Sequence, residues 1–232
     1  MASPLIDSRI GFAHRGGRKH GKDNTIECFE SALEMGANGL ETDIWLTRDG
    51  VAVLEHSGLV RSGLIPRPIS WTKFGALPSE IPRLEDFYKR LGTDFELSID
   101  IKAGIAGAEA IAIAGDAEVE ALSRLWLCHW DLKRLRAWRL TSPDVRLVNS
   151  VRKLTIREGI EKRARRLAAV GIDALNLRAD EWTVRDVEVL HAHGILAFGW
   201  NAHDAKTLAG LLELGIDAVY SDDVPMMVEL LG

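Results

Sequence analysis

The sequence predicts an α/β fold, a (β/α)8 or TIM barrel formed by one domain over residues 1–232, and three observations support this. Apolar runs of strand length alternate with longer segments of helical period. One short run interrupts the alternation, and the remainder forms eight βα units, the number that closes a barrel. A short pattern at the junction between a helix and the next strand also recurs three times.

The expected strands and helices follow one another along the whole chain. Nine apolar runs are typical of strands: Ile10–His14, Leu40–Trp45, Val51–His56, Leu97–Lys102, Leu125–His129, Val145–Val151, Ala174–Leu177, Ile195–Asn201 and Ala218–Ser221. Helical period marks Thr25–Met35, Ile105–Leu122, Leu132–Leu140, Thr155–Val170, Val184–His193, Ala205–Leu214 and Val224–Leu231. This alternation favours a parallel sheet covered by helices. A doubly wound sheet is disfavoured because no GxGxxG motif follows a strand.

The run Val51–His56 does not fit the alternation. It follows Leu40–Trp45 across residues 47–50, a tight-turn sequence too short for a helical crossover. We therefore interpret it as an excursion after the second strand. The irregular stretch Ser57–Pro82 comes next and holds four prolines, and we expect it to be a small loop insertion over the barrel mouth.

The three repeated junctions share one plan. In residues 35–40, 170–175 and 214–219 a helix ends, a glycine follows, and a strand begins three residues later. Glycine suits this place because it adopts the left-handed backbone conformation that often ends a helix. The repeated turn chemistry indicates that one structural unit is repeated.

Composition and charge exclude several classes of protein. Hydrophobic residues make up 47% and charged residues 27%, which is ordinary for a globular domain and unlike a collagen-like or disordered chain. The 29 Lys and Arg are outnumbered by 34 Asp and Glu, whereas a nucleic-acid-binding protein is expected to be basic. Cys28 and Cys128 are too few for a disulfide framework.

The sequence shows no membrane or secretion signal. No segment reaches the roughly 18 consecutive apolar residues of a transmembrane helix. The N-terminal residues lack the charged start and apolar run of a signal peptide. We therefore expect a soluble, cytoplasmic protein.

Acidic residues on two expected strands are the first candidates for chemistry. Strand alternation places Glu41 and Asp43 on one face of their strand, and Asp100 and Lys102 on the face opposite an apolar set. Asp100 and Lys102 are expected to point into the barrel near its C-terminal end, where barrel active sites lie. A half-exposed strand with solvated acids would explain Glu41 and Asp43 alone, and a buried ion pair would explain Asp100 and Lys102 alone. Together, three carboxylates from adjacent strands predict a site for a divalent cation, Mg²⁺ or Ca²⁺.

Basic side chains and histidines accompany these acids. The first strand ends with His14, and Arg15 follows with a guanidinium that matches phosphate geometry. The ammonium of Lys102 also suits a phosphate oxygen. His56 ends the excursion, which we expect to fold back beside the acids. Two histidines near one cation site suit acid–base chemistry near neutral pH, so the combination favours a functional interpretation.

This set of residues resembles the glycerophosphodiester phosphodiesterase family, a family of metal-dependent (β/α)8-barrel enzymes. The matching fragments keep their order over nearly the whole chain. They are HRGG at 14–17, DNT at 23–25, ETD at 41–43, TRDG at 47–50 before His56, DIK at 100–102, GWN at 199–201, and GIDAVYSD at 215–222 followed by Pro225.

The resemblance implies a role for each candidate in the metal and acid–base chemistry. Glu41, Asp43 and Asp100 would bind the divalent cation. His14 and His56 would act as the acid–base pair, one removing and the other supplying a proton.

The resemblance also implies how the substrate is bound and cleaved. Arg15 and Lys102 would contact the phosphate, and Trp200 would line the substrate pocket. The reaction would hydrolyse a glycerophosphodiester to sn-glycerol 3-phosphate and an alcohol. A neighbouring hydroxyl of the substrate would attack phosphorus to give a cyclic phosphate, which water would then open.

The chain departs from the family pattern beside His56 and at one of the expected cation ligands. Ser57 follows His56 where the family has Asp, and Asp100 stands where the family has Glu. The Asp-x-Lys sequence also resembles the related sphingomyelinase D group. A phosphodiesterase of lysophospholipase D or sphingomyelinase D type is therefore a second interpretation. A non-catalytic barrel that binds phosphodiesters is a third.

Overall fold

The computed structural model describes residues 5–6, 8–61 and 65–232 of the chain. Eight parallel strands form a closed ring, because β1 pairs with both β2 and β11. The ring consists of β1 (Ile10–His14), β2 (Gly39–Leu46), β6 (Glu96–Ile101), β7 (Leu125–His129), β8 (Arg146–Ser150), β9 (Ala174–Arg178), β10 (Leu196–Trp200) and β11 (Ala218–Ser221). The predicted (β/α)8 barrel is thereby confirmed.

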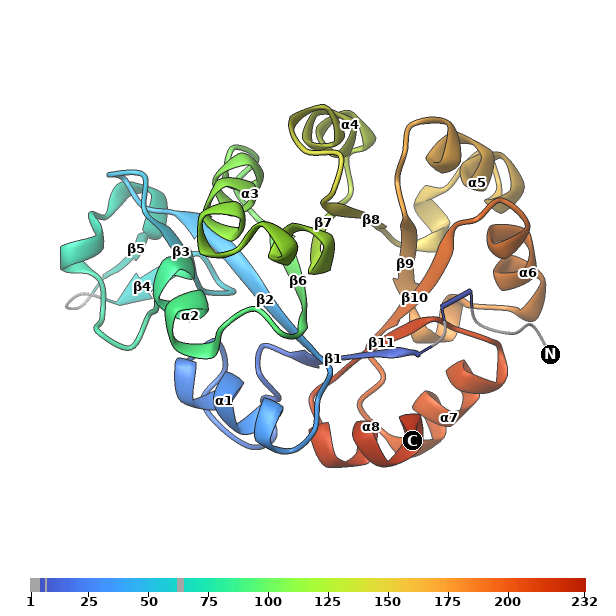
Figure 1. Cartoon of the computed structure of the whole chain (residues 1–232), viewed down its shortest axis with the longest axis horizontal. Helices are drawn as coiled ribbons and strands as arrows, with labels where there is room; N and C mark the ends of the chain where they lie inside the picture. The colour runs from blue at the N-terminus through green and yellow to red at the C-terminus, as the bar shows by residue number, and fades with distance from the viewer. Residues whose placement is uncertain (1–4, 7, 62–64) are drawn as a thin grey trace.

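A helix follows each barrel strand and covers the outside of the ring (Figure 1). The helices are α1 (Ile26–Glu34), α2 (Leu84–Leu91), α3 (Ala106–Ala117), α4 (Leu132–Thr141), α5 (Ile160–Ala169), α6 (Val184–Ala192), α7 (Ala205–Glu213) and α8 (Val224–Leu231). The main apolar core lies between these helices and the outward faces of the strands. The apolar face of each strand therefore packs against the helices, and the opposite face points into the barrel interior.

The excursion after the second strand forms as expected. Strand β3 (Ala52–Leu54) pairs antiparallel with the end of β2. The segment 57–82 was expected to be irregular, but it contains a hairpin of β4 (Leu59–Arg61) and β5 (Pro66–Pro68), then short 3₁₀ turns η1 (Ile69–Trp71) and η2 (Phe74–Ala76). Residues 62–64 of that segment lie outside the described ranges. A small separate apolar cluster holds the excursion together.

The structure corrects several helix predictions. Helix α2 was not among the expected segments, although Leu84, Phe87, Tyr88 and Leu91 recur at helical spacing and pack into the core. Helix α5 begins at Ile160 rather than Thr155, because Gly159 has a φ of 81° and Lys153–Thr155 forms a separate 3₁₀ turn, η4. The expected helix Ile105–Leu122 divides into α3 and the 3₁₀ turn η3 (Val119–Arg124).

The repeated glycine junctions take the predicted conformation. Gly36, Gly171 and Gly215 have φ values of 93°, 70° and 87°, in the region that favours glycine. Each follows the last turn of a helix that leads into a barrel strand. The sequence repeat therefore reflects a repeated backbone turn.

An aromatic cluster fills the barrel interior below the strand ends. The Phe12 and Tyr220 rings stack with centroids 4.9 Å apart, and Trp126 lies 5.1 Å from Phe198. All four rings are buried. This plug supports the cavity above it and closes the barrel from below.

Two expectations drawn from composition bear on the described chain. Cys28 and Cys128 are buried free thiols, as expected for a chain without a disulfide framework. Within residues 5–6, 8–61 and 65–232, no helix combines the length and the apolar character that crossing a membrane requires.

Asp217 fixes the start of the last strand, and its loss is expected to destabilise the fold. Its fully buried carboxylate accepts hydrogen bonds from the backbone N–H groups of Leu5 and Ala197 and contacts Nε2 of His191 at 2.8 Å. Asp217→Ala should lower the free energy of unfolding by about 3–5 kcal/mol, because it leaves the N–H of Ala197 and the His191 ring inside the protein without this partner. Urea unfolding would measure the change.

The helix-capping residue Asp204 provides a matched control. It accepts a hydrogen bond from the backbone N–H of Thr207 at the start of α7 and is exposed. Asp204→Ala should cost about 1 kcal/mol, the usual value of a helix cap. Equal effects of the two substitutions would contradict the special role of Asp217.

Candidate active site

A cavity of about 670 Å³ opens at the carboxyl ends of the barrel strands. The eight residues that the sequence motifs single out all line it: His14, Arg15, Glu41, Asp43, His56, Asp100, Lys102 and Trp200. Strand register explains much of this convergence, because Asp43 of β2 lies opposite Asp100 of β6, and His14 of β1 lies opposite Glu41. The structure therefore brings together side chains that are up to 186 residues apart in the sequence.

Glu41 is a buried carboxyl group beside His14. Its Oε2 accepts a hydrogen bond from the backbone N–H of Arg15 at 2.9 Å and lies 3.9 Å from Nε2 of His14. Burial raises the pKa of Glu41 to about 7, and the His14 ring and the Arg15 N–H offset this only in part. Within the described chain no Lys or Arg side chain pairs with it. A bound cation would therefore strongly stabilise the ionised form of Glu41.

Asp43 is surrounded by basic groups. Its Oδ2 accepts a hydrogen bond from Nδ1 of His56 at 3.0 Å, and its Oδ1 contacts Nζ of Lys102 at 2.9 Å. Nε of Arg15 lies 3.4 Å from Oδ2. Burial alone would raise the pKa of Asp43, but the His56 hydrogen bond and the Lys102 ammonium outweigh burial and lower it. Asp43 is therefore a carboxylate at neutral pH.

Lys102 bridges the carboxylates of two neighbouring strands. Its Nζ lies 2.5 Å from Oδ2 of Asp100 as well as 2.9 Å from Asp43. Burial opposes the ammonium charge, but the two carboxylates outweigh burial and raise the pKa of Lys102. The side chain is therefore a permanent positive charge at the cavity wall.

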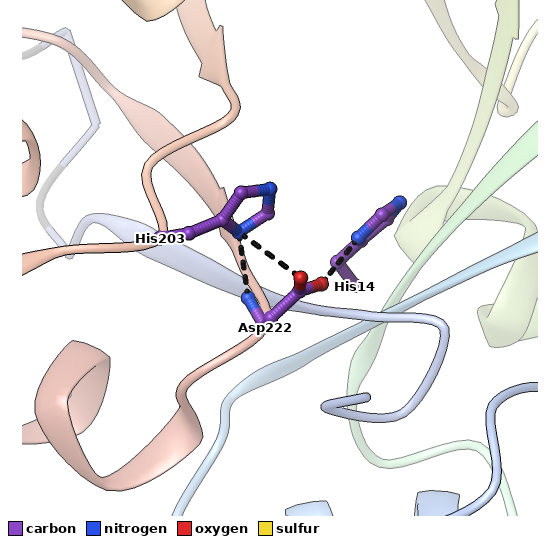
Figure 2. A group of neighbouring side chains, drawn as sticks. All are labelled: His14, His203 and Asp222. Carbon is purple, nitrogen blue, oxygen red and sulfur yellow. Dashed lines mark hydrogen bonds and ion pairs between the residues drawn. The ribbon is translucent and has the colours of Figure 1, made fainter. Parts of the chain in front are cut away.

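His14 and His203 approach Asp222 from two sides (Figure 2). Oδ1 of Asp222 accepts a hydrogen bond from Nδ1 of His14 at 2.6 Å. Nδ1 of His203 instead accepts the backbone N–H of Asp222 at 3.0 Å. Burial acts to lower the pKa of both rings. At His14 the Glu41 carboxylate and the Asp222 hydrogen bond outweigh burial, so the pKa of His14 is raised. At His203 burial prevails, so the pKa of His203 is lowered.

Two groups of side chains could be considered for a divalent cation. The ligand atoms of His14, His203 and Asp222 lie within 4.8 Å of one another. However, Nδ1 of each ring already takes part in a hydrogen bond to Asp222, so a metal ion bound to these atoms would have to displace both bonds. Glu41 and its neighbouring carboxylates fit a hard cation better, because Glu41 is buried and, among the described residues, pairs with no Lys or Arg side chain.

Asp222 is the main site residue that the sequence analysis missed. The sequence analysis recognised the motif at 215–222 but assigned Asp222 only a structural role. It assigned no role to His203. The structure assigns the capping of α8 to Asp223, which accepts the N–H of Met226, while Asp222 contacts His14. Strand alternation offered a signal, since Asp222 lies two residues after the inward-facing Tyr220.

Comparison with known proteins places this site in a family. The model of the glycerophosphoryl diester phosphodiesterase family matches residues 14–226. The chain is 26% identical to the glycerophosphodiester phosphodiesterase of Caldanaerobacter subterraneus subsp. tengcongensis over 239 residues, which cover 94% of this chain and 96% of that relative.

Solved structures show the same fold. The glycerophosphodiester phosphodiesterase of Thermotoga maritima superposes with a TM-score of 0.83 at 23% identity, covering 97% of this chain and 99% of that one. An Oleispira antarctica phosphodiesterase, solved with the product sn-glycerol-3-phosphate, gives a TM-score of 0.78 at 21% identity and covers 96% of each chain. The family match spans both the acid cluster and Asp222, and the chain therefore belongs to the glycerophosphoryl diester phosphodiesterase family and is a phosphoric diester hydrolase.

Proposed function

We propose that this chain hydrolyses glycerophosphodiesters to sn-glycerol 3-phosphate and an alcohol, with the help of a divalent cation. The observation that carries the proposal is the convergence of two cationic side chains, two histidines and three carboxylates on one cavity. Cleavage of a phosphodiester requires positive charge at the phosphoryl oxygens, a base for the nucleophile and an acid for the leaving group. The sn-glycerol-3-phosphate bound to the Oleispira relative supports the assigned product.

Arg15 and Lys102 would bind the phosphoryl oxygens. Nε of Arg15 is buried and, among the described residues, has no hydrogen-bond partner, although it lies 3.4 Å from Oδ2 of Asp43. A phosphate oxygen would satisfy this donor. The Lys102 ammonium stands on the other side of Asp43 and adds a second positive charge. Both groups would stabilise the charge that develops on the phosphoryl oxygens.

His14 and His56 would transfer the protons. Asp222 and Asp43 each hold Nδ1–H of one ring, so Nε2 of that ring is the atom available for proton transfer. One histidine accepts the proton of the substrate hydroxyl that attacks phosphorus, and the other protonates the oxygen of the departing alcohol. The roles reverse when water opens the cyclic phosphate.

Glu41, Asp43 and Asp100 would hold the cation, and their oxygen ligands suit Mg²⁺ or Ca²⁺. A bound divalent cation would stabilise negative charge on the phosphoryl oxygens. Lys102 contacts two of these carboxylates, so it balances their charge and competes for the same oxygens.

A lysophospholipid is a second candidate substrate because apolar side chains are exposed beside the cavity. Leu59, Ile105, Trp130 and Leu154 are 52%, 74%, 70% and 75% exposed. Ile105, Trp130 and Leu154 lie on the segments that follow β6, β7 and β8, at the carboxyl ends of adjacent barrel strands, and Leu59 lies on the excursion after β2. An acyl chain could cover such side chains. The phosphodiester chemistry would be the same, with a lipid on one side of the phosphate.

Removal of the cation is expected to abolish most turnover. Release of sn-glycerol 3-phosphate from glycerophosphoglycerol and glycerophosphocholine should occur with Mg²⁺ or Ca²⁺ and fall on the order of 10²-fold or more in EDTA. Readdition of the metal should restore the rate. The isosteric variant Glu41→Gln should need a higher metal concentration, since it removes one charged ligand.

Turnover that is unaffected by EDTA would contradict the cation's role. Hydrolysis of lysophosphatidylcholine, without hydrolysis of either water-soluble diester, would replace the proposed substrate by the second candidate. Absence of turnover on all three compounds with either metal would overturn the proposed function.

A further inference from the structure

One wall of the cavity takes no part in the chemistry described above. The reacting groups come from β1, β2, β6 and the segment after β3. The ends of β8 and β9 contribute Ser150, Arg152 and Asn176 to the same cavity. The register of these two strands places Ser150 directly opposite Asn176. This polar wall lies on the side of the barrel away from the β2 and β6 carboxylates.

Asn176 presents a buried acceptor without a partner. The side chain faces the barrel interior, because its neighbours Leu175 and Leu177 pack outward into the helix layer. It is only 5% exposed. Its Nδ2 donates a hydrogen bond to Oγ of Ser150 at 3.1 Å, while Oδ1 is buried and has no hydrogen-bond partner in the described part of the chain. Such an acceptor favours a ligand that brings a donor.

Ser150 provides the complementary donor. Its Oγ accepts the hydrogen bond from Asn176, which leaves its own O–H free to donate elsewhere. The two side chains therefore offer an acceptor and a donor side by side. An alcohol hydroxyl is the group that matches this pair, because it donates one hydrogen bond and accepts another.

Charge on the same wall disfavours a cationic ligand. Arg152 lines the cavity, and its Nε pairs with Oε1 of Glu181 at 2.6 Å, so that carboxylate is already neutralised. The acidic residues that line the cavity in the described chain, Glu41, Asp43 and Asp100, belong to β2 and β6. A quaternary ammonium at the polar wall would meet no free carboxylate and could not satisfy Oδ1 of Asn176.

We propose that Ser150, Arg152 and Asn176 form the subsite of the departing alcohol and select a polyol, such as glycerol, over choline. The proposal rests on the proposed function, since it names the second arm of the same phosphodiester. Rejection of a ligand that lacks the expected hydroxyl is strong where a buried polar group would be left unpaired.

The test compares two diesters that share one glycerol arm and differ in the other. Wild-type kcat/KM for glycerophosphoglycerol should exceed that for glycerophosphocholine by at least about 10-fold. Asn176→Leu should lower kcat/KM for glycerophosphoglycerol by about 10-fold or more and leave that for glycerophosphocholine unchanged or higher. Ser150→Ala should act in the same direction. Glycerophosphocholine is the internal control, since a misfolded variant loses both activities.

The outcomes separate this proposal from the proposed function. A wild-type preference for glycerophosphocholine would overturn the subsite. Equal losses on both substrates in a folded Asn176→Leu variant would also overturn it, because the wall would then bind the shared glycerol arm. If the wild type cleaved neither diester, the proposed function would fail. Calorimetric titration of glycerophosphoglycerol into wild type and Asn176→Leu would then still test the subsite, and equal affinities would reject it.

Discussion

Alanine in place of His14 is expected to lower kcat for a glycerophosphodiester by about 10³-fold, within the usual range for loss of an acid–base group. The ring lines the cavity, contacts Glu41 and is held by Asp222 at 2.6 Å, so its Nε2 is fixed in place for proton transfer. Steady-state release of sn-glycerol 3-phosphate would measure the loss. A variant that retains more than about a tenth of the wild-type kcat would contradict the role, since acid–base groups usually contribute far more.

Asp222→Asn should reproduce part of this loss without removing the ring. An amide can donate to Nδ1 of His14, which would move the ring proton to Nε2 and remove its basic lone pair. We expect kcat to fall about 10- to 100-fold, as for other residues that orient a functional side chain. Loss of the carboxylate also removes a cause of the raised pKa of His14. The limb of the pH–rate profile that reports His14 should therefore move to lower pH, and an unchanged profile would argue against the contact.

Asp43→Asn is expected to have the second large effect, because one carboxylate serves three partners. It holds Nδ1–H of His56, contacts Lys102 and is a candidate cation ligand. Removing its charge should lower kcat by at least about 10²-fold, since a proton-transfer group loses its orientation. It should also weaken Mg²⁺ or Ca²⁺ binding at least about 10-fold, which calorimetric titration would measure.

Glu55→Gln is the matched control for Asp43→Asn. It also removes one negative charge close to His56, but the Glu55 carboxylate accepts hydrogen bonds from Ser57 and does not line the cavity. Its kcat and metal affinity should stay within about twofold of wild type, because surface charges are well screened by solvent. Equal losses in both variants would indicate a general charge effect rather than the specific contacts of Asp43.

Local sequence patterns predicted the eight barrel strands and the acid cluster because both depend on short-range rules. Alternation fixes which face of a strand carries Glu41 and Asp43, and the register of β2 with β6 then brings Asp100 beside Asp43. The excursion was likewise recognised from a tight turn, and it delivers His56 to Asp43. Their roles in catalysis and metal binding remain predictions for the experiments above.

Features that depend on distant contacts were harder to predict. The contact of Asp222 with His14 joins residues 208 positions apart, and strand alternation, which places Asp222 on the inward side, does not identify its partner. The pairing of Ser150 with Asn176 requires the register of β8 and β9. Helix α2 was overlooked because it is only eight residues long and follows a proline-rich segment, although its apolar spacing is helical.

The aromatic plug below the cavity has a kinetic consequence. The rings of Phe12, Trp126, Phe198 and Tyr220 fill the barrel interior below the cavity. Substrate and both products therefore enter and leave through the same opening. A neutral alcohol has no charge to hold it, whereas the phosphate product would be attracted to Arg15 and Lys102, which line the cavity. The alcohol should therefore depart first and sn-glycerol 3-phosphate last. Accumulated sn-glycerol 3-phosphate would then compete with the diester for the free enzyme, so the rate would fall as product builds up.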